Sequence, residues 1–346
     1  MKRFLPIFII AFALVSCENE VDLPIVEKNP IEFGNVETRA AISSDNDMID
    51  SGLGFGVFGY VSGVVDPLLT NEKVYWKDNS EWHYDNTRYW IPDHTFHFFA
   101  YYPYDDETDA TEPISNVVVN GDGEVGYQLS FVTPEAADFD LLSAYASVDT
   151  GDAEFNAANP VQIQFGHEMV NVNLKIWRDG AKHTNDKMRV KSVTLSNVTW
   201  GGLLTKTDGG STSWTNTDRL PVLSGTAVEP ETEIGAAVRI PNGIETGGEP
   251  CSPFGENGLL LIPATISGAN AVSLSIVYEL QLYRANENTW SEYSHNITLP
   301  ATTWKAGTQI TYNVLLSNIV DITFYYISTS VTSWGTPQVG GTIIIK

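Results

Sequence analysis

The sequence predicts an all-β protein built from β-sandwiches, and three observations support this prediction. From residue 55 onward, short runs of alternating apolar and polar residues are separated by turn residues, which is typical of strands. No window of a dozen residues has a convincing helical period. Charged residues make up only 18% of the chain and aromatic residues 11%, a balance typical of a secreted β-protein. With 346 residues, the chain is long enough for about two such domains.

The first residues have the features of an export signal. Lys2 and Arg3 precede an apolar run over 4–15, which is too short to span a bilayer comfortably. Small residues lead from this run to Cys17, and the arrangement resembles a bacterial lipobox. The resemblance implies a lipoprotein signal peptide over 1–16 and lipidation of Cys17. The alternative is an ordinary secretory signal followed by an incidental cysteine.

An extended, partly apolar segment follows the predicted anchor. Val21, Leu23 and Ile25 alternate with polar residues, and Ile31 and Phe33 resume the alternation after a proline. The segment ends near the sequence Glu-Thr-Arg-Ala-Ala at 37–41, in which residue 39 is the only arginine between residues 4 and 87. We therefore treat 17–39 as a separate N-terminal strand segment, which the family resemblance given below implies to be a propeptide.

The remaining strands are predicted from apolar alternation and from the turn residues between them. Residues 90–103 read as a turn followed by a strongly aromatic strand, and a short helix is conceivable around Leu141 and Leu142. Glycine and threonine crowd 200–260, which indicates long loops within a sheet domain. A polar stretch at 178–185 marks the predicted boundary between domains over 40–180 and 181–346. The other predicted strands are 55–61, 161–165, 170–176, 193–195, 276–282 and pieces of 322–345.

Three histidines and one cysteine are candidates for site chemistry. His94 and His97 are an odd number of residues apart, so on a strand they point to opposite faces, and with His83 they are best interpreted as ordinary polar positions. Cys251 lies in a Pro/Gly-rich loop and has no partner cysteine or adjacent base in the sequence, which favours an inert thiol.

The acidic residues do not form a recognisable metal or catalytic motif. The sequence from Asp45 resembles a calcium loop, but it has Asp50 at the sixth position and Gly56 at the twelfth, where an EF-hand needs glycine and glutamate. A solvated loop is therefore favoured. Nucleophile-elbow, zinc-protease, phosphate-loop and dinucleotide motifs are lacking in the sequence, so we expect no enzyme, metal or cofactor. The net charge of −24 makes nucleic acid an improbable partner.

Five aromatic residues cluster within fifteen positions: Trp76, Trp82, Tyr84, Tyr89 and Trp90. Exposed flat rings would suit carbohydrate binding, whereas buried ones would pack in a core. Core packing is favoured, and a surface lipoprotein of the outer membrane that binds glycans is retained as an alternative function.

Several short pieces, in order along the chain, together resemble the fimbrillin family of Bacteroidetes, in particular its Mfa-like pilus subunits. No single piece is specific, and the resemblance rests on their order over nearly the whole chain. The pieces are the lipobox at Cys17, Thr-Arg-Ala at 38–40, the aromatic strand at 96–103, Phe-Gly-His at 165–167 before 170–176, Leu-Ile-Pro at 261–263, Trp-Lys-Ala-Gly at 304–307 before 312–314, and Val-Thr-Ser-Trp at 331–334.

The resemblance implies two transthyretin-like β-sandwich domains in tandem and a lipoprotein precursor at the cell outer membrane. It also implies cleavage by a trypsin-like protease, which would here fall between Arg39 and Ala40 and remove the N-terminal strand. The vacated groove would take a strand from another pilus subunit, usually a C-terminal one. The expected partners are therefore other pilus subunits, the processing protease and the outer membrane, and the expected location is the cell-surface fimbria. The sequence leaves open which strand is donated and where in the pilus the subunit lies.

Overall fold

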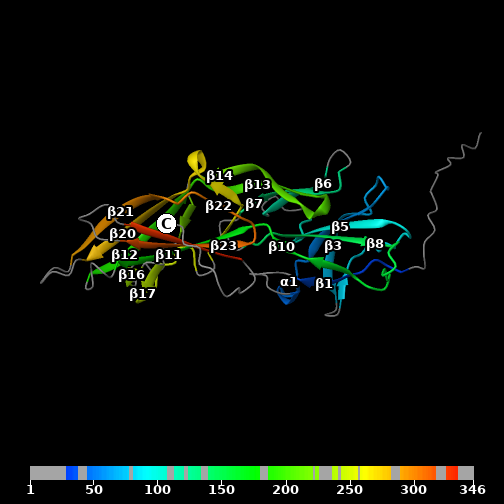
Figure 1. Cartoon of the computed structure of the whole chain (residues 1–346), viewed down its shortest axis with the longest axis horizontal. Helices are drawn as coiled ribbons and strands as arrows, with labels where there is room; N and C mark the ends of the chain where they lie inside the picture. The colour runs from blue at the N-terminus through cyan, green and yellow to red at the C-terminus, as the bar shows by residue number, and fades with distance from the viewer. Residues whose placement is uncertain are drawn as a thin grey trace, which may run out of the picture.

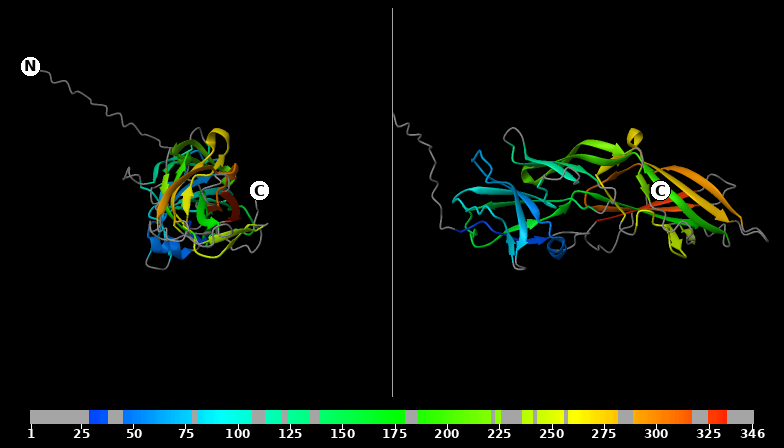
Figure 2. Two further views of the ribbon diagram at one scale, coloured as in Figure 1. Left: turned by 90° about the vertical axis from the view of Figure 1, so that its left-hand side faces the viewer. Right: turned by 180° about the vertical axis from the view of Figure 1, so that it is seen from behind.

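The structure is a computed structural model that confirms the all-β prediction. It describes residues 29–37, 45–77, 81–106, 113–120, 124–133, 139–179, 186–220, 223–225, 236–240, 243–255, 258–281, 289–316 and 325–333. Figure 1 shows an elongated molecule, with N-terminal strands at one end and C-terminal strands at the other. Figure 2 shows its narrow cross-section when the molecule is viewed end-on. Within the described ranges, no helix is long and apolar enough to cross a membrane.

The N-terminal end is built on one six-stranded sheet that is covered on both faces. In spatial order its strands are β10 (Gly166–His167), β8 (Leu142–Asp149), β5 (Thr95–Tyr102), β2 (Phe55–Val61), β3 (Leu69–Lys77) and β4 (Glu81–His83). One face packs against the two-stranded sheet of β1 (Phe33–Glu37) and β9 (Val161–Gln164) and against helix α1 (Asp45–Ser51). The other face packs against a four-stranded sheet.

Alternating residues of the central strands belong to two different cores. In β5, Phe96 and Phe98 face β1 and β9, whereas Phe99 and Tyr101 face the four-stranded sheet. Strand β2 is buried at all seven positions for the same reason. Because successive side chains of a strand point to opposite faces, a strand covered on both sides needs apolar residues throughout. This explains the aromatic density at 96–102.

The four-stranded sheet joins sequence from both predicted domains. Its order is β14 (Thr212–Leu220), β13 (Val198–Thr207), β7 (Gly126–Val132) and β6 (Ile114–Val119), with β13 antiparallel to β7 over 201–207. Figure 1 places these strands in the middle of the molecule. The boundary between residues 180 and 181 stays a prediction. Strands β13 and β14, which follow it in the sequence, complete the packing of the N-terminal end.

The C-terminal end is a sandwich of two sheets around a second apolar core. One sheet contains β17 (Gly243–Thr246), β16 (Ala236–Ile240), β11 (Val170–Asp179), β23 (Thr308–Leu316) and β24 (Tyr325–Ser333), with β18 (Leu259–Leu261) also paired to β11. The other contains β15 (Leu223–Gly225), β12 (Lys187–Ser196), β20 (Ser273–Gln281) and β21 (Trp290–Thr298). A short pair, β19 (Ala264–Ile266) and β22 (Thr302–Trp304), lies beside them. The core includes Trp304 and Tyr312, and both side chains are buried.

Two local predictions are wrong, and a third feature concerns a helix that was weighed but not favoured. The expected loop at 45–50 is the helix α1, because Met48 is buried against the N-terminal core and the Ser51 hydroxyl donates to the Met48 carbonyl at 2.7 Å. The short helix that was conceivable but not favoured at Leu141 and Leu142 does not form there: β8 begins at Leu142, and the side chains of Leu141 and Leu142 enter opposite cores. Residues 198–220 form the long hairpin of β13 and β14 instead of loops, since β13 has a ladder partner on each side.

Buried tyrosines make the fold sensitive to alkali. Burial raises the pKa of Tyr278 and of Tyr312 to about 12, and it also raises the pKa of Tyr60, Tyr84 and Tyr127. A tyrosine side chain in the unfolded chain has a pKa of about 10. Between about pH 10 and pH 12 the unfolded chain therefore loses protons that the folded chain keeps, so the free energy of unfolding falls as the pH rises.

We therefore expect the buried tyrosines to ionise only as the strands unfold. A titration that follows tyrosinate absorbance and circular dichroism together tests this, with the guanidinium-unfolded chain as the control. Ionisation of all 15 tyrosines near pH 10 with an intact β signal would contradict it.

Candidate functional site: a groove filled by the N-terminal strand

Residues 29–37 lie in a groove of the N-terminal core, here called the β1 groove and bounded by Arg88, Phe98 and Val161. Strand β1 runs parallel to β9, with Phe33 opposite Val161. The Val161 amide donates to the Glu32 carbonyl at 2.7 Å, and the Ile31 amide donates to the Arg88 carbonyl at 2.8 Å. The segment is thus held by backbone hydrogen bonds to two different parts of the chain.

Two side chains of this segment enter the core. Ile31 is fully buried and Phe33 is 4% exposed. The Phe33 ring meets Tyr84 and Phe98 edge-on, with centroid separations of 5.5 and 5.6 Å. Burial of one such side chain stabilises a fold by about 1.5–3 kcal/mol, and edge-to-face ring pairs add about 0.5–1.5 kcal/mol each. The N-terminal strand is therefore a structural part of the core.

A buried tyrosine fastens the start of the strand. The Tyr84 hydroxyl donates to the Ile31 carbonyl at 2.8 Å and accepts the Arg88 amide at 3.0 Å. Burial raises the pKa of Tyr84, so the hydroxyl keeps the proton that it donates.

A glycine lets the strand pass close to its neighbour. A Cβ atom at Gly34 would lie 2.7 Å from Pro160 Cγ, which is closer than side chains tolerate. The β1 groove therefore needs a glycine, or a strand shifted outward, at this position.

The chain is anchored in the same core on both sides of the predicted cut. Upstream, Ile31 and Phe33 belong to this core, and downstream α1 contributes Met48. Arg39 and Ala40, the predicted processing residues, and Cys17, the predicted lipidation residue, lie outside the described residues. Their roles stay predictions.

A cavity of about 480 Å³, here called the side cavity, lies beside β1. It is lined by 30–34 and by the aromatic residues Trp76, Trp82 and Tyr84, with Thr87 and Glu81 also lining it. Trp76 is half-buried, and its ring centroid lies 5.4 Å from that of Trp82 at a steep angle of 72°. The cavity is thus an aromatic recess along the strand.

The aromatic cluster is chiefly part of the core, as the favoured interpretation predicted. Trp82, Tyr84 and Trp90 are buried, whereas Tyr89 is 39% exposed. Buried and mutually tilted rings do not form the flat exposed platform that the glycan-binding alternative requires.

The remaining candidates lie in separate places. His97 contacts Ser62 at 3.0 Å and Tyr145 at 2.9 Å, and His94 contacts the Pro92 carbonyl. His83 lies 3.8 Å from Asp85 at the surface. Cys251 is buried in the C-terminal core, where its backbone forms a bridge with Ile176. Among the residues that the structure describes, no group of three or more metal-ligating side chains is found.

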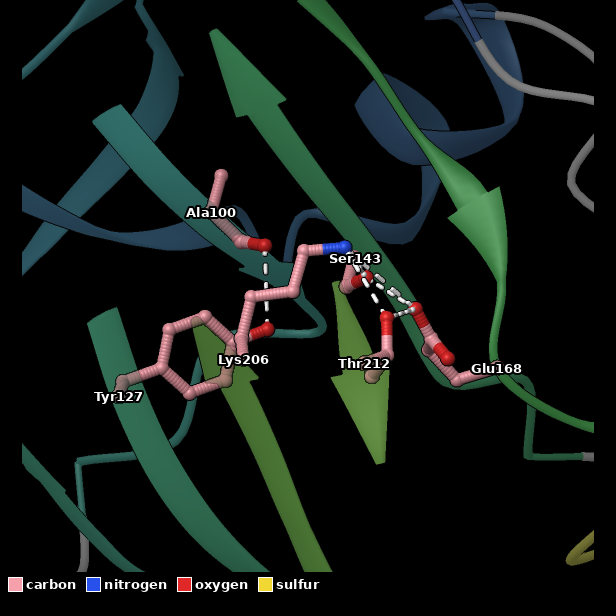
Figure 3. Close-up of polar contacts among 6 residues, drawn as sticks. All are labelled: Ala100, Tyr127, Ser143, Glu168, Lys206 and Thr212. Carbon is pink, nitrogen blue, oxygen red and sulfur yellow. Dashed lines mark hydrogen bonds and ion pairs between the residues drawn. The ribbon is translucent and has the colours of Figure 1, made fainter. Parts of the chain in front are cut away.

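A buried ionic cluster that no sequence motif indicated joins residues of several strands (Figure 3). Lys206 Nζ lies 3.7 Å from Glu168 Oε1, and both side chains are less than a tenth exposed. Two hydroxyls bridge this pair. Lys206 Nζ donates to Ser143 Oγ at 2.8 Å and to Thr212 Oγ1 at 3.2 Å, and both hydroxyls donate in turn to Glu168 Oε1.

This ionic cluster connects separate layers of the fold. Ser143 belongs to β8 of the six-stranded sheet, and Lys206 and Thr212 belong to β13 and β14 of the four-stranded sheet. Burial lowers the pKa of Lys206, while the Glu168 carboxylate opposes this effect. The sequence signal was weak, because Lys206 stands between two threonines in a threonine- and glycine-rich stretch that was interpreted as loop.

Comparisons with known proteins find a matching family and similar individual proteins. The sequence profile of a family described as fimbrillin-like matches residues 38–334. A curated relative, "Fimbrium subunit Fim1C" of Phocaeicola vulgatus, is 26% identical over 180 residues, which is 47% of this chain and 47% of the relative. The match thus spans about half the length of the curated relative.

The structure is also similar to that of a solved protein. A fimbrial protein from Bacteroides vulgatus superposes with a TM-score of 0.66, over 88% of this chain and 99% of that chain. The two sequences are 18% identical, so this likeness shows a shared fold.

Proposed function

Because the chain belongs to the fimbrillin-like family, we propose that it is a structural subunit of a cell-surface fimbria. The observation that carries the proposal is the position of residues 29–37. This apolar segment, which precedes Arg39 in the sequence, fills a groove of the N-terminal core with Ile31 and Phe33. The proposal assigns the chain no catalytic activity and no cofactor.

In the proposed pathway the precursor is exported as a lipoprotein through Cys17 and reaches the outer membrane. A trypsin-like protease then cuts between Arg39 and Ala40. Without residues 29–37, the rings of Phe55, Tyr84 and Phe98 would lose the Phe33 ring that covers them. Exposed apolar surface and unpaired strand edges favour pairing with another strand.

A strand from a second subunit would then replace β1 in the groove. Main-chain hydrogen bonds to Val161 and Arg88 would be remade, and alternate side chains would refill the positions of Ile31 and Phe33. Since the donor and the acceptor surfaces differ, each subunit can pass a strand to the next, and a contact that does not close on itself produces a filament.

The N-terminus of material sheared from the cell surface tests this function. We expect polymerised protein to begin at Ala40, because the strand upstream must be cut off before the groove can be refilled. Edman sequencing or peptide mass spectrometry of purified filaments measures it, with the membrane-bound fraction as control. Filament protein that begins at lipidated Cys17 would contradict cleavage, and a chain found only as a monomer on the membrane would contradict the structural role.

A further inference from the structure

We propose that the side cavity is the place where the incoming strand of a second copy first binds, before β1 has left the β1 groove. This inference rests on the proposed function and adds to it the starting point of strand replacement. The proposed occupant is the segment 334–346 of the second copy.

Cleavage at Arg39 alone does not empty the β1 groove. In the uncut chain Ile31 and Phe33 are buried and the Ile31 and Val161 amides hold the segment by hydrogen bonds, and none of these contacts involves the bond after Arg39, so we expect them to persist after the cut. An incoming strand that could bind only after residues 29–37 had dissociated completely would bind slowly. If the incoming strand can first bind at a neighbouring site while β1 is still in place, it can replace the contacts of β1 with the groove one after another.

The side cavity has the position that such a site requires. It is lined both by residues 30–34 and by β4. Among the described strands, β1 has a ladder only with β9 and β4 only with β3. The side of residues 30–34 away from β9 is bonded to the chain at Pro30 and Ile31, by the Pro30–Tyr89 bridge and the hydrogen bond to the Arg88 carbonyl. The recess is therefore bordered by the edge of β1 from Phe33 onward and by the edge of β4. Such edges pair readily with an extended segment.

The segment 334–346 matches this recess in length and in chemistry. Its 13 residues reach at most about 45 Å when extended, more than the nine residues 29–37 need. It contains the apolar run Ile343 to Ile345, which suits walls made by Trp76, Trp82 and Tyr84.

The charge of this segment is also suitable. Although the chain carries 43 acidic residues, none of them lies in 334–346, which ends in Lys346. Exposed Glu32 and Glu81 line the side cavity, and the segment has no acidic side chain that these two carboxylates would repel.

The first experiment measures binding to the intact, uncut chain. A fluorescently labelled synthetic peptide with the sequence of 334–346 is titrated with the full chain, and anisotropy is followed. We expect saturable binding that Thr87→Trp weakens at least about tenfold by filling the side cavity. Thr70→Trp is the matched control, because Thr70 is likewise exposed on this end of the molecule but does not line the cavity.

The second experiment measures replacement after limited digestion at Arg39. Release of the fragment that contains 29–37 is followed by mass spectrometry after the peptide is added. We expect Thr87→Trp to slow the release about tenfold and Thr70→Trp to leave the rate unchanged. Equal rates in both variants, or no binding to the uncut chain, would overturn the side cavity as the starting point. Failure of any strand to replace β1 in the cut chain would instead overturn the proposed strand exchange.

Discussion

Replacement of Arg39 by alanine is expected to leave a lipidated protein on the cell surface and to abolish its filaments. Arg39 and Lys28 are the only basic residues in 18–39, so a trypsin-like protease has few alternative sites in this segment. Without a cut, residues 29–37 stay covalently attached to α1 and to the core that they fill. An incoming strand would then compete with a segment that can always return, because its local concentration is high.

Electron microscopy of cells and immunoblotting of the sheared fraction measure this effect. Lys28→Ala is the matched control, since it removes the other basic residue of the segment and is expected to leave filaments unchanged. Normal filaments from the Arg39→Ala variant would show that cleavage at this position is not needed for assembly.

Replacement of Lys206 by methionine is expected to destabilise the fold by about 3–5 kcal/mol, the usual cost of removing one partner of a buried ion pair. The Glu168 carboxylate would remain buried, with only the Ser143 and Thr212 hydroxyls to stabilise it. Since these groups connect the six-stranded and four-stranded sheets, we expect the N-terminal end to lose its packing first. Urea unfolding followed by tryptophan fluorescence measures the shift in midpoint.

Two controls separate the charge effect from a packing effect. The double variant Lys206→Met with Glu168→Gln removes both charges and is expected to recover most of the lost stability, because a neutral buried pair leaves no uncompensated ion. Lys191→Met removes a lysine that lies 3.3 Å from Glu279 but is exposed, and its effect is expected to be much smaller. Equal losses in Lys206→Met and in the double variant would show that the cluster contributes through packing alone.

The strands that the sequence predicted correctly are those that can be recognised from the pattern of apolar, polar and turn residues within the strand itself. Strand β2 has the predicted bounds of 55–61, and β11 begins at the predicted residue Val170. In β11 apolar and polar residues alternate as the side chains do, whereas β2 is a short apolar run with two glycines that is buried on both faces. The helix α1 escaped prediction because seven residues with one buried anchor, Met48, show no helical period.

The groove was predicted only in part, for a related reason. The alternation around Ile31 and Phe33 and the lone Arg39 marked the N-terminal segment as special. The rings that receive Phe33 come from Phe55, Tyr84 and Phe98, which are distant in sequence and carry no local sign of their common neighbour. The side cavity was likewise invisible, since its walls come from three separate segments.

The sequence by itself determined the all-β class, the acidic surface and most strand positions, because these depend on composition and on the period of neighbouring residues. Only the tertiary structure decided which strands pair. It placed β13 of the later sequence beside β7 of the earlier one, and β11 parallel to β23 across more than a hundred residues. It also brought Lys206 to Glu168. These choices depend on which long-range contacts bury the most apolar surface and satisfy the most polar groups together, and no short window of sequence contains that information.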